Sequence, residues 1–374
     1  MQQSKRNISL DLYRILCMFL ITTIHIVGYS NLTDVIPQNH FNSYVILVLQ
    51  VFQAIAINGF ILISAYFLVS AKTATKKIIS FWLQLLITSV CILLISVVFV
   101  SPNLPISLLA KSFFPILTNH YWYPTNYIIL LLFVPFFNKV ILAMDKRQFE
   151  VCIVLLAGVA TFFFHVNPFF NPEIYIGHDS HSLLWFFTLY FIGAYLRLYG
   201  VSVSRWIVWC TLLLSGILLL GSIALENNAL FNITGSFSFV KKVINLMHLT
   251  QNNSILALLF TVCSFVIFEN MNLPSSKALS AIFAFLAPTV FGIYLIQEHD
   301  AIRQFLWDTV HIEQWATSYG LFAIMIGIFL CIWAFSILLY LFYQLMHKLF
   351  VNKIEDCIVN YWEKIKSVIS KRMS

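Results

Sequence analysis

The amino-acid sequence predicts an all-α protein: a polytopic transmembrane helix bundle of about ten spanning helices, with both termini in the cytoplasm. Of its 374 residues, 60% are hydrophobic and only 10% are charged, and the mean hydropathy is +0.87. A soluble domain of this length needs a more highly charged surface. Long apolar runs recur along the chain, and about 20 apolar residues are enough to cross a bilayer as a helix. The composition therefore excludes a soluble protein.

Ten apolar segments are long enough to be considered as spans. The second and the last exceed the thickness of a bilayer, so we expect them to tilt or to extend beyond it. Lys5 and Arg6 precede the first segment, and no small-residue cleavage site follows it, which indicates an uncleaved signal anchor. The segments are 9–29, 42–69, 78–100, 122–143, 149–166, 182–199, 206–225, 254–270, 281–299 and 318–347.

The basic residues favour a cytoplasmic N-terminus. With ten spans in that orientation, four of the 22 Lys and Arg residues lie outside, at Lys111, Lys241, Lys242 and Arg303. Arg14 lies inside the first segment. The other seventeen fall in cytoplasmic segments, as the positive-inside rule requires. They are Lys5, Arg6, Lys72, Lys76, Lys77, Lys139, Lys146, Arg147, Arg197, Arg205, Lys277, Lys348, Lys353, Lys364, Lys366, Lys371 and Arg372.

This arrangement predicts one transmembrane domain over residues 1–347 and a basic cytoplasmic tail over 348–374, with membrane lipid around the bundle. The net charge of +7 does not indicate nucleic acid, because no polar region long enough to fold holds a basic patch interleaved with aromatic residues. The seven cysteines show no paired spacing, and the histidines show no tight ligand spacing. We therefore expect neither disulfides nor a metal ion.

The first segment carries two unusual residues, Arg14 and His25. Charged side chains inside a bilayer are costly and usually face a cavity where they have a function. Eleven residues of α-helix turn through about 20° more than three full turns and rise about 16 Å. One helix face therefore presents a cation toward the cytoplasm and a titratable base further out. In the structural alternatives, Arg14 extends to the inner surface beside Asp11, and His25 bridges to a neighbouring helix.

Arg14, ten intervening residues and His25 resemble the R-x10-H motif of the acyltransferase-3 family. Four further stretches resemble segments of that family in the same order, so the resemblance runs from about residue 9 to 347. The five stretches are "LDLYRILCMFLITTIHI", "NGFILISAYFLVSAKTATKKI", "HYWYPTNYIILLLFVPFFNKVI", "LLWFFTLYFIGAYLRLY" and "FGIYLIQEHDAIRQFLW". The last is similar to capsule-type members of the family.

The resemblance implies an integral-membrane O-acetyltransferase of the bacterial inner or plasma membrane. Its donor would be cytoplasmic acetyl-CoA. Its acceptor would be a hydroxyl of a cell-surface polysaccharide or of its lipid-linked precursor. His25 would act as the general base, a role that suits the near-neutral pKa of histidine. Glu298 would hold the histidine ring in the useful tautomer, as carboxylates do in acyl-transfer triads.

Phosphate groups of coenzyme A would be bound by basic residues at the inner end of the same site, because the planar guanidinium group recognises phosphate well. The candidates are Arg14, Lys72, Lys76 and Lys77.

A second group of residues would contact the acceptor. Ser64 matches the family's second-helix motif, and three residues at the start of the fourth segment could stack on or hydrogen-bond a sugar. These are Trp122, Tyr123 and Asn126. In the alternative interpretation they form an interfacial aromatic belt.

The chain departs from the family pattern at two positions. Where Ser-Gly is usual, it has Ser64 and Ala65, so we expect the backbone there to approach its neighbour less closely. Where "L-I-H" is common, it has Gln297, followed by Glu298 and His299.

Two other functions remain open from the sequence. A transporter or flippase for a lipid-linked saccharide would share the fold and the aromatic loops, but would not need a base on the same helix face as a phosphate-binding arginine. An externally acting glycosyltransferase usually needs an acidic outer site, and the outer loops contain few Asp or Glu residues.

Overall fold

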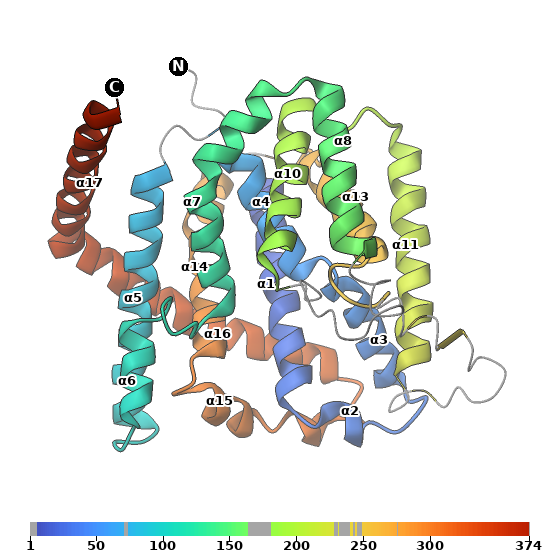
Figure 1. The fold of residues 1–374 in the computed structure, drawn as a ribbon. Helices are drawn as coiled ribbons and strands as arrows, with labels where there is room; N and C mark the ends of the chain where they lie inside the picture. The colour runs from blue at the N-terminus through green and yellow to red at the C-terminus, as the bar shows by residue number, and fades with distance from the viewer. Residues whose placement is uncertain are drawn as a thin grey trace.

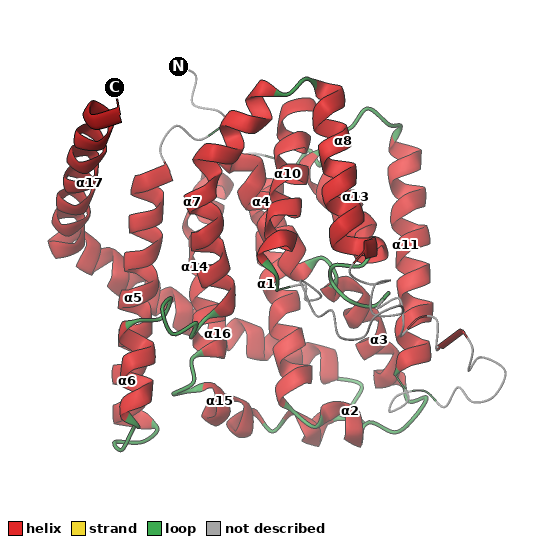
Figure 2. Cartoon of the chain, viewed as in Figure 1, coloured by secondary structure: helices red, strands yellow, loops and turns green. Residues whose placement is uncertain are grey.

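The structure is a computed structural model that describes residues 6–70, 74–163, 181–227, 231, 240–241, 244, 249–274 and 276–373. Within these ranges it is built from helices and loops and contains no β-strand (Figure 2). The predicted all-α fold is confirmed. Two predicted features lie outside the described residues. One is Lys72, and the other is the stretch 170–180, which the predicted orientation places outside the cell between the segments 149–166 and 182–199.

The helices follow one another along the chain and mostly run along the bundle (Figure 1). The α-helices are α1 (Ile8–Tyr29), α2 (Leu32–Val35), α3 (Phe41–Gln53), α4 (Ala56–Leu68), α5 (Ala74–Phe99), α6 (Ile106–Phe113), α7 (Trp122–Ala143), α8 (Lys146–Ala157), α10 (Leu183–Tyr199), α11 (Arg205–Glu226), α13 (Ile255–Glu269), α14 (Lys277–Glu298), α15 (Arg303–Val310), α16 (Leu321–Met346) and α17 (Asn352–Met373). Short π-helices follow α8 and α16, at Gly158–Phe163 and His347–Val351, and a 3₁₀ turn spans Ile312–Trp315.

Several helix starts are set by a capping side chain, which satisfies a backbone N–H group that the first turn leaves free. The Asn7 side chain accepts from the backbone N–H of Leu10 at the start of α1. Asp145 forms a capping box with Gln148 at the start of α8. Serine caps begin four further helices: Ser182 of α10, Ser204 of α11, Ser254 of α13 and Ser276 of α14.

Seven helical stretches of the described chain are long and apolar enough to cross a membrane: Ile8–Tyr29, Phe41–Leu68, Lys76–Phe99, Trp122–Ala143, Arg205–Glu226, Lys277–Glu298 and Leu321–Trp362. Two shorter apolar helices, α10 and α13, coincide with the predicted segments 182–199 and 254–270. The remaining predicted segment, 149–166, begins as α8 and the following π-helix and then leaves the described residues. Each predicted segment thus contains helix.

The second predicted span is two helices rather than one, because the chain breaks between α3 and α4 at Ala54 and Ile55. A break inside a membrane is tolerated when other groups satisfy the freed backbone. The carbonyl of Ala54 accepts from Asn58 Nδ2 at 3.1 Å and from Thr261 Oγ1 at 3.0 Å. Asn58 Oδ1 in turn accepts from the indole N–H of Trp185, at 2.8 Å. Hydrogen bonds from α4, α10 and α13 therefore stabilise the break between α3 and α4.

The C-terminal 348–374 region is a continuation of helix rather than an irregular tail. α16 crosses the bundle obliquely, and α17 rises beside α5 (Figure 1). Ser80 Oγ donates to Glu355 Oε1 at 2.7 Å, and His347 Nε2 lies 3.0 Å from Glu355 Oε2. Lys76 Nζ lies 3.4 Å from Asp356 Oδ1. The cytoplasmic location of this C-terminal region remains a prediction.

Helices α4 and α10 approach each other closely. A Cβ atom added at Gly193 would lie 2.5 Å from the Cβ of Ala65, so the two backbones meet there with almost no space between them. We had expected Ala65 to keep the two backbones further apart. They meet closely because the residue opposite Ala65 is Gly193. The close approach therefore depends on the glycine at position 193, opposite the small side chain of Ala65.

Helix α1 lies in the middle of the bundle and packs against α3, α4, α13, α14 and α16. The connections α7–α8 and α10–α11 lie at one end of the bundle, and α2, α6 and α15 lie at the other (Figure 1). The predicted orientation would make the first end cytoplasmic.

Candidate active site

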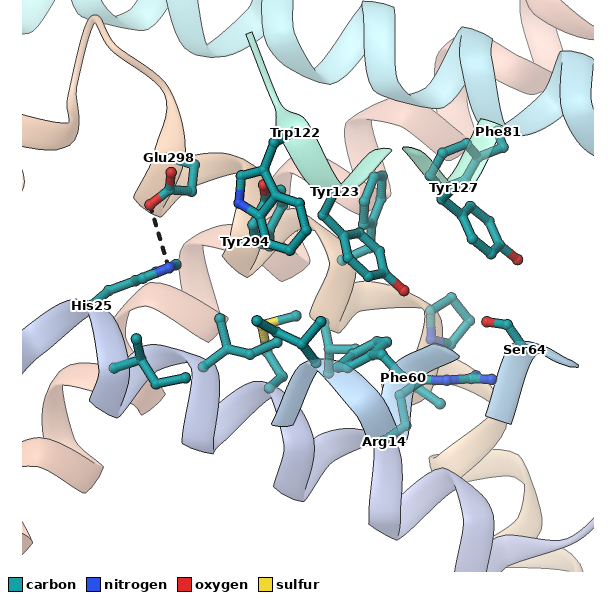
Figure 3. Close-up of a pocket in the computed structure, with 18 of the residues that line it drawn as sticks. Arg14, His25, Phe60, Ser64, Phe81, Trp122, Tyr123, Tyr127, Tyr294 and Glu298 are labelled. Atoms are coloured by element: carbon teal, nitrogen blue, oxygen red, sulfur yellow. Dashed lines mark ion pairs between the residues drawn. The ribbon is translucent and has the colours of Figure 1, made fainter. Parts of the chain in front are cut away.

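A cavity of about 430 Å³ opens along α1, between this helix and helices α4, α5, α7 and α14. Arg14 and His25 both line it, at opposite ends (Figure 3). Figure 3 shows Ser64 near the Arg14 end and Glu298 at the His25 end. The prediction that one face of the first helix presents both residues is confirmed, because α1 is continuous over the whole interval.

The guanidinium group of Arg14 has most of its hydrogen-bonding capacity unused. Its closest acidic neighbour is Asp11, with Arg14 NH1 3.7 Å from Asp11 Oδ1. That carboxylate is held more tightly by Arg6, whose NH2 donates to Asp11 Oδ1 at 3.0 Å. Among the described residues no acceptor lies within hydrogen-bonding distance of Arg14. Arg14 thus presents free donors to the cavity, an arrangement suited to an anion.

The imidazole ring of His25 is held on both sides by the end of α14. His25 Nδ1 lies 2.8 Å from Gln297 Oε1, and His25 Nε2 lies 3.3 Å from Glu298 Oε1. The predicted partnership with Glu298 is therefore present in space. However, the shorter contact is made by Gln297, one of the two departures from the family pattern.

Glu298 is held by two groups besides His25. Tyr29 OH donates to Glu298 Oε1 at 2.7 Å, and Arg303 NH1 lies 3.8 Å from Glu298 Oε2. Arg303 also lies over the ring of Tyr29, with the guanidinium carbon 5.2 Å from the ring centroid. Glu298 is therefore a paired, mostly buried carboxylate at the C-terminal end of α14.

Aromatic side chains form much of the wall between the two ends. Trp122, Tyr123 and Tyr127 all line the cavity, so they face inward rather than forming a lipid-facing belt. Tyr123 lies 6.0 Å from Tyr294, centroid to centroid. Asn126, on the same helix, does not line the cavity, and its Nδ2 donates to the backbone carbonyl of His181 at 2.5 Å. Of the four predicted acceptor-contacting residues, Ser64, Trp122 and Tyr123 therefore reach the cavity.

The two described lysines predicted to bind the donor do not line the cavity. Lys76 lies at the start of α5 and pairs with Asp356, and Lys77 beside it is exposed. Of the three predicted donor-binding residues that the structure describes, Arg14 alone lines the cavity.

The loop that follows Glu298 is anchored by buried polar groups. His299 Nε2 lies 3.1 Å from the carbonyl of Ser89 and 3.3 Å from Ser112 Oγ, and its Nδ1 accepts from the N–H of Ala301. Burial lowers the pKa of His299 to about 3, so the ring is neutral near pH 7. The Asp300 carboxylate lies 3.5 Å from His120 Nδ1 and 2.7 Å from Lys111 Nζ, and these two neighbours lower its pKa. These contacts fix the end of α14.

A family model described as an acyltransferase domain matches residues 7–351 of the sequence. The chain belongs to the acyltransferase-3 family. It is therefore a membrane acyltransferase, and its central cavity, with a histidine at one end and an unsatisfied arginine at the other, is the candidate site of acyl transfer. No curated protein and no solved structure matches the chain.

Several residues that line the cavity of this acyltransferase were not predicted from the sequence. Tyr29 lies one turn beyond His25 on the same face of α1, so its i+4 spacing was a usable signal. Gln84 of α5 and Phe291 of α14 also line the cavity, and nothing in their local sequence distinguishes them from packing residues. No cluster with metal-binding geometry occurs among the described His, Cys, Asp and Glu residues.

Proposed function

We propose that this acyltransferase moves an acetyl group from cytoplasmic acetyl-CoA to a hydroxyl of a cell-surface polysaccharide or of its lipid-linked precursor, in a bacterial inner or plasma membrane. One observation carries the proposal. A single cavity holds an arginine with unused donors at one end and a histidine beside a carboxylate at the other. Coenzyme A has its phosphates and its thioester at opposite ends of a long arm, and so needs a site with this polarity.

Arg14 would bind the donor's phosphate groups, with the aromatic wall enclosing the apolar part of the arm. Because its ion pair with Asp11 is long, at 3.7 Å, the Arg14 guanidinium group can bind an anion without breaking a short hydrogen bond to the described residues. Lys72, Lys76 and Lys77 would then raise the local concentration of the donor at the inner surface without contacting the bound thioester. Ser64 and Trp122 face the same space and would contact the enclosed substrates.

His25 would act as the general base. The acceptor O–H bond breaks as its proton passes to His25 Nε2, and the oxygen forms a bond with the thioester carbonyl carbon. Glu298, 3.3 Å from Nε2, stabilises the imidazolium ion that results. The tetrahedral intermediate collapses by breaking the C–S bond, and the imidazolium returns its proton to the departing thiolate. The products are the O-acetyl ester and free coenzyme A thiol.

A transporter or flippase of a lipid-linked saccharide is the main alternative. It would use the same aromatic wall, but it would move its cargo without consuming a thioester. The two functions therefore differ in one directly measurable product, free thiol.

The decisive experiment uses the full chain reconstituted in lipid nanodiscs with acetyl-CoA and a panel of surface glycans. Wild-type protein should release free thiol and form O-acetyl ester in equal amounts. The His25→Gln variant keeps hydrogen-bonding capacity but has no basic nitrogen, so transfer should fall by roughly two to four orders of magnitude at normal yield. Wild-type transfer by this variant would end the claim that His25 is the base. Glycan movement without thiol release would establish the transporter.

A further inference from the structure

The hydrogen bonds behind His25 form a chain that begins in the backbone of α1. Thr22 Oγ1 lies 3.0 Å from the carbonyl oxygen of Met18, to which it donates its only proton. Its oxygen is then free to accept, and Gln297 Nε2 donates to it at 2.8 Å. Thr22 and Gln297 are both fully buried, so no water competes for these groups. The Thr22 hydroxyl therefore sets the orientation of the Gln297 amide.

An amide held in this way turns its oxygen toward His25. Gln297 Oε1 lies 2.8 Å from His25 Nδ1 and can only accept a hydrogen bond. The Nδ1 atom must therefore carry the ring proton when the imidazole is neutral. The lone pair is left on Nε2, which faces Glu298 and the cavity.

We propose that Gln297, oriented by Thr22, is the positioning residue that keeps the His25 proton on Nδ1 and so makes Nε2 the basic nitrogen. The catalytic consequence rests on the proposed function, whereas the tautomer itself does not. In acyl-transfer triads a carboxylate performs this orienting task. In this chain an uncharged amide performs it, and the carboxylate of Glu298 lies at the other ring nitrogen.

The division of labour follows from charge. Gln297 orients the ring without adding charge, so it does not itself favour the imidazolium ion. Glu298 adjoins the nitrogen that receives the proton, and the two form an ion pair once transfer has occurred. Before transfer, Nε2 and Glu298 Oε1 can both only accept a hydrogen bond, so neither donates to the other. The hydroxyl group of the sugar substrate would donate its hydrogen to them. The departure from "L-I-H" thus leaves an orienting group in place.

The direct test is the tautomer of His25 in protein labelled with ¹⁵N-histidine and reconstituted in nanodiscs at pH 8. The spectrum of His25→Gln, subtracted from that of wild type, identifies the two ring nitrogens of His25. We expect a protonated Nδ1 and a lone pair on Nε2. The reverse tautomer in the wild type would overturn the inference, whether or not His25 proves to be the catalytic base.

Variants of the two orienting residues separate positioning from packing. Gln297→Leu and Thr22→Val should each produce a mixture of tautomers, because the first removes the acceptor and the second releases the amide. Gln297→Glu and Thr22→Ser are the matched controls, because each keeps an oxygen where it is needed and should keep Nδ1 protonated. An unchanged wild-type tautomer in both Gln297→Leu and Thr22→Val would contradict the proposal.

Turnover supplies the second readout. Gln297→Leu should lower kcat roughly 10- to 100-fold, the scale of one hydrogen bond to a group that becomes charged, with donor affinity unchanged. Gln297→Glu should move the acid limb of the kcat–pH profile to higher pH, because a carboxylate at Nδ1 stabilises the imidazolium. A profile that does not move in Gln297→Glu would assign the residue to packing alone.

Discussion

Arg14 and His25 line one cavity from one face of α1, separated by three turns of unbroken helix. Their separation along the axis is about 16 Å, set only by the helical rise. Nothing between them is charged, and aromatic side chains from α7 and α14 enclose the space. This relationship between a loosely paired cation and a buried base leads to the first two predictions.

Arg14→Lys should weaken coenzyme A binding roughly tenfold, and Arg14→Gln should weaken it further. Lysine keeps the charge but loses the planar fork that matches a phosphate group. Binding of ³H-labelled acetyl-CoA to nanodiscs measures the effect. Lys146→Gln is the control, because Lys146 is exposed and pairs loosely with Glu150 at 3.9 Å. Equal donor binding by wild type and Arg14→Gln would remove the assigned role.

Glu298→Gln should lower kcat for transfer about 10- to 100-fold with donor affinity unchanged. The substitution keeps an acceptor for the Tyr29 hydroxyl but removes the charge that stabilises the His25 imidazolium. Tyr29→Phe is the matched control, because it deletes the neighbouring hydrogen bond and leaves the charge. If Tyr29→Phe reduced kcat as much as Glu298→Gln, packing at this end would explain both effects.

Gly193→Ala should destabilise the bundle by about 1–3 kcal/mol, the usual cost of overpacking. The new Cβ would lie 2.5 Å from Ala65 Cβ and 3.0 Å from the carbonyl oxygen of Leu62. Ala65→Gly in the same chain should restore part of the loss, because it removes the first clash and leaves the second. Gly221→Ala serves as the control, since a Cβ there meets no atom within 4 Å. Thermal unfolding in detergent compares the four proteins.

Stability should fall as pH is lowered from about 6.5 toward 3, partly because of His299. Its folded-state pKa of about 3 lies below the ordinary value of 6.5, so over this interval the unfolded chain binds a proton that the folded protein does not. One such group contributes at most about 1.4 kcal/mol per pH unit. His299→Asn should flatten the slope of melting temperature against pH. His311→Asn, at an exposed left-handed position, should not.

The orientation predicted from the basic residues can be tested with single cysteines in a background lacking the seven native ones. An impermeant thiol reagent applied to intact cells should label Asn103→Cys and Thr317→Cys and should spare Ser202→Cys. All three positions are exposed, and they lie in connections next to α6, α16 and α11. Labelling of Ser202→Cys in unbroken cells would invert the bundle.

The sequence was sufficient for the features that depend on one helix at a time. Apolar length located the spans, and helical periodicity placed Arg14 and His25 on one face. The contacts that complete the site come from pairs of helices, and periodicity does not say which turns of α1 and α14 meet. For that reason the sequence showed Gln297 only as a departure from the family pattern, whereas in the structure its side chain contacts His25. Asn126 and Lys76 illustrate the opposite error. Both have suitable side chains in approximately the right part of the sequence, but neither lines the cavity.

The pairing of His25 with α14 also bears on how the protein is made. His25 and Gln297 are separated by 272 residues, so α1 is synthesised well before α14. At a typical elongation rate of about 5–20 residues per second, roughly 15–55 s pass before its partner exists. During that interval two polar groups of α1 already have partners within the same helix: Asp11 lies three residues before Arg14, and Thr22 donates to the backbone carbonyl of Met18. This local pairing stabilises α1 in the bilayer until α14, which completes the site, has been synthesised.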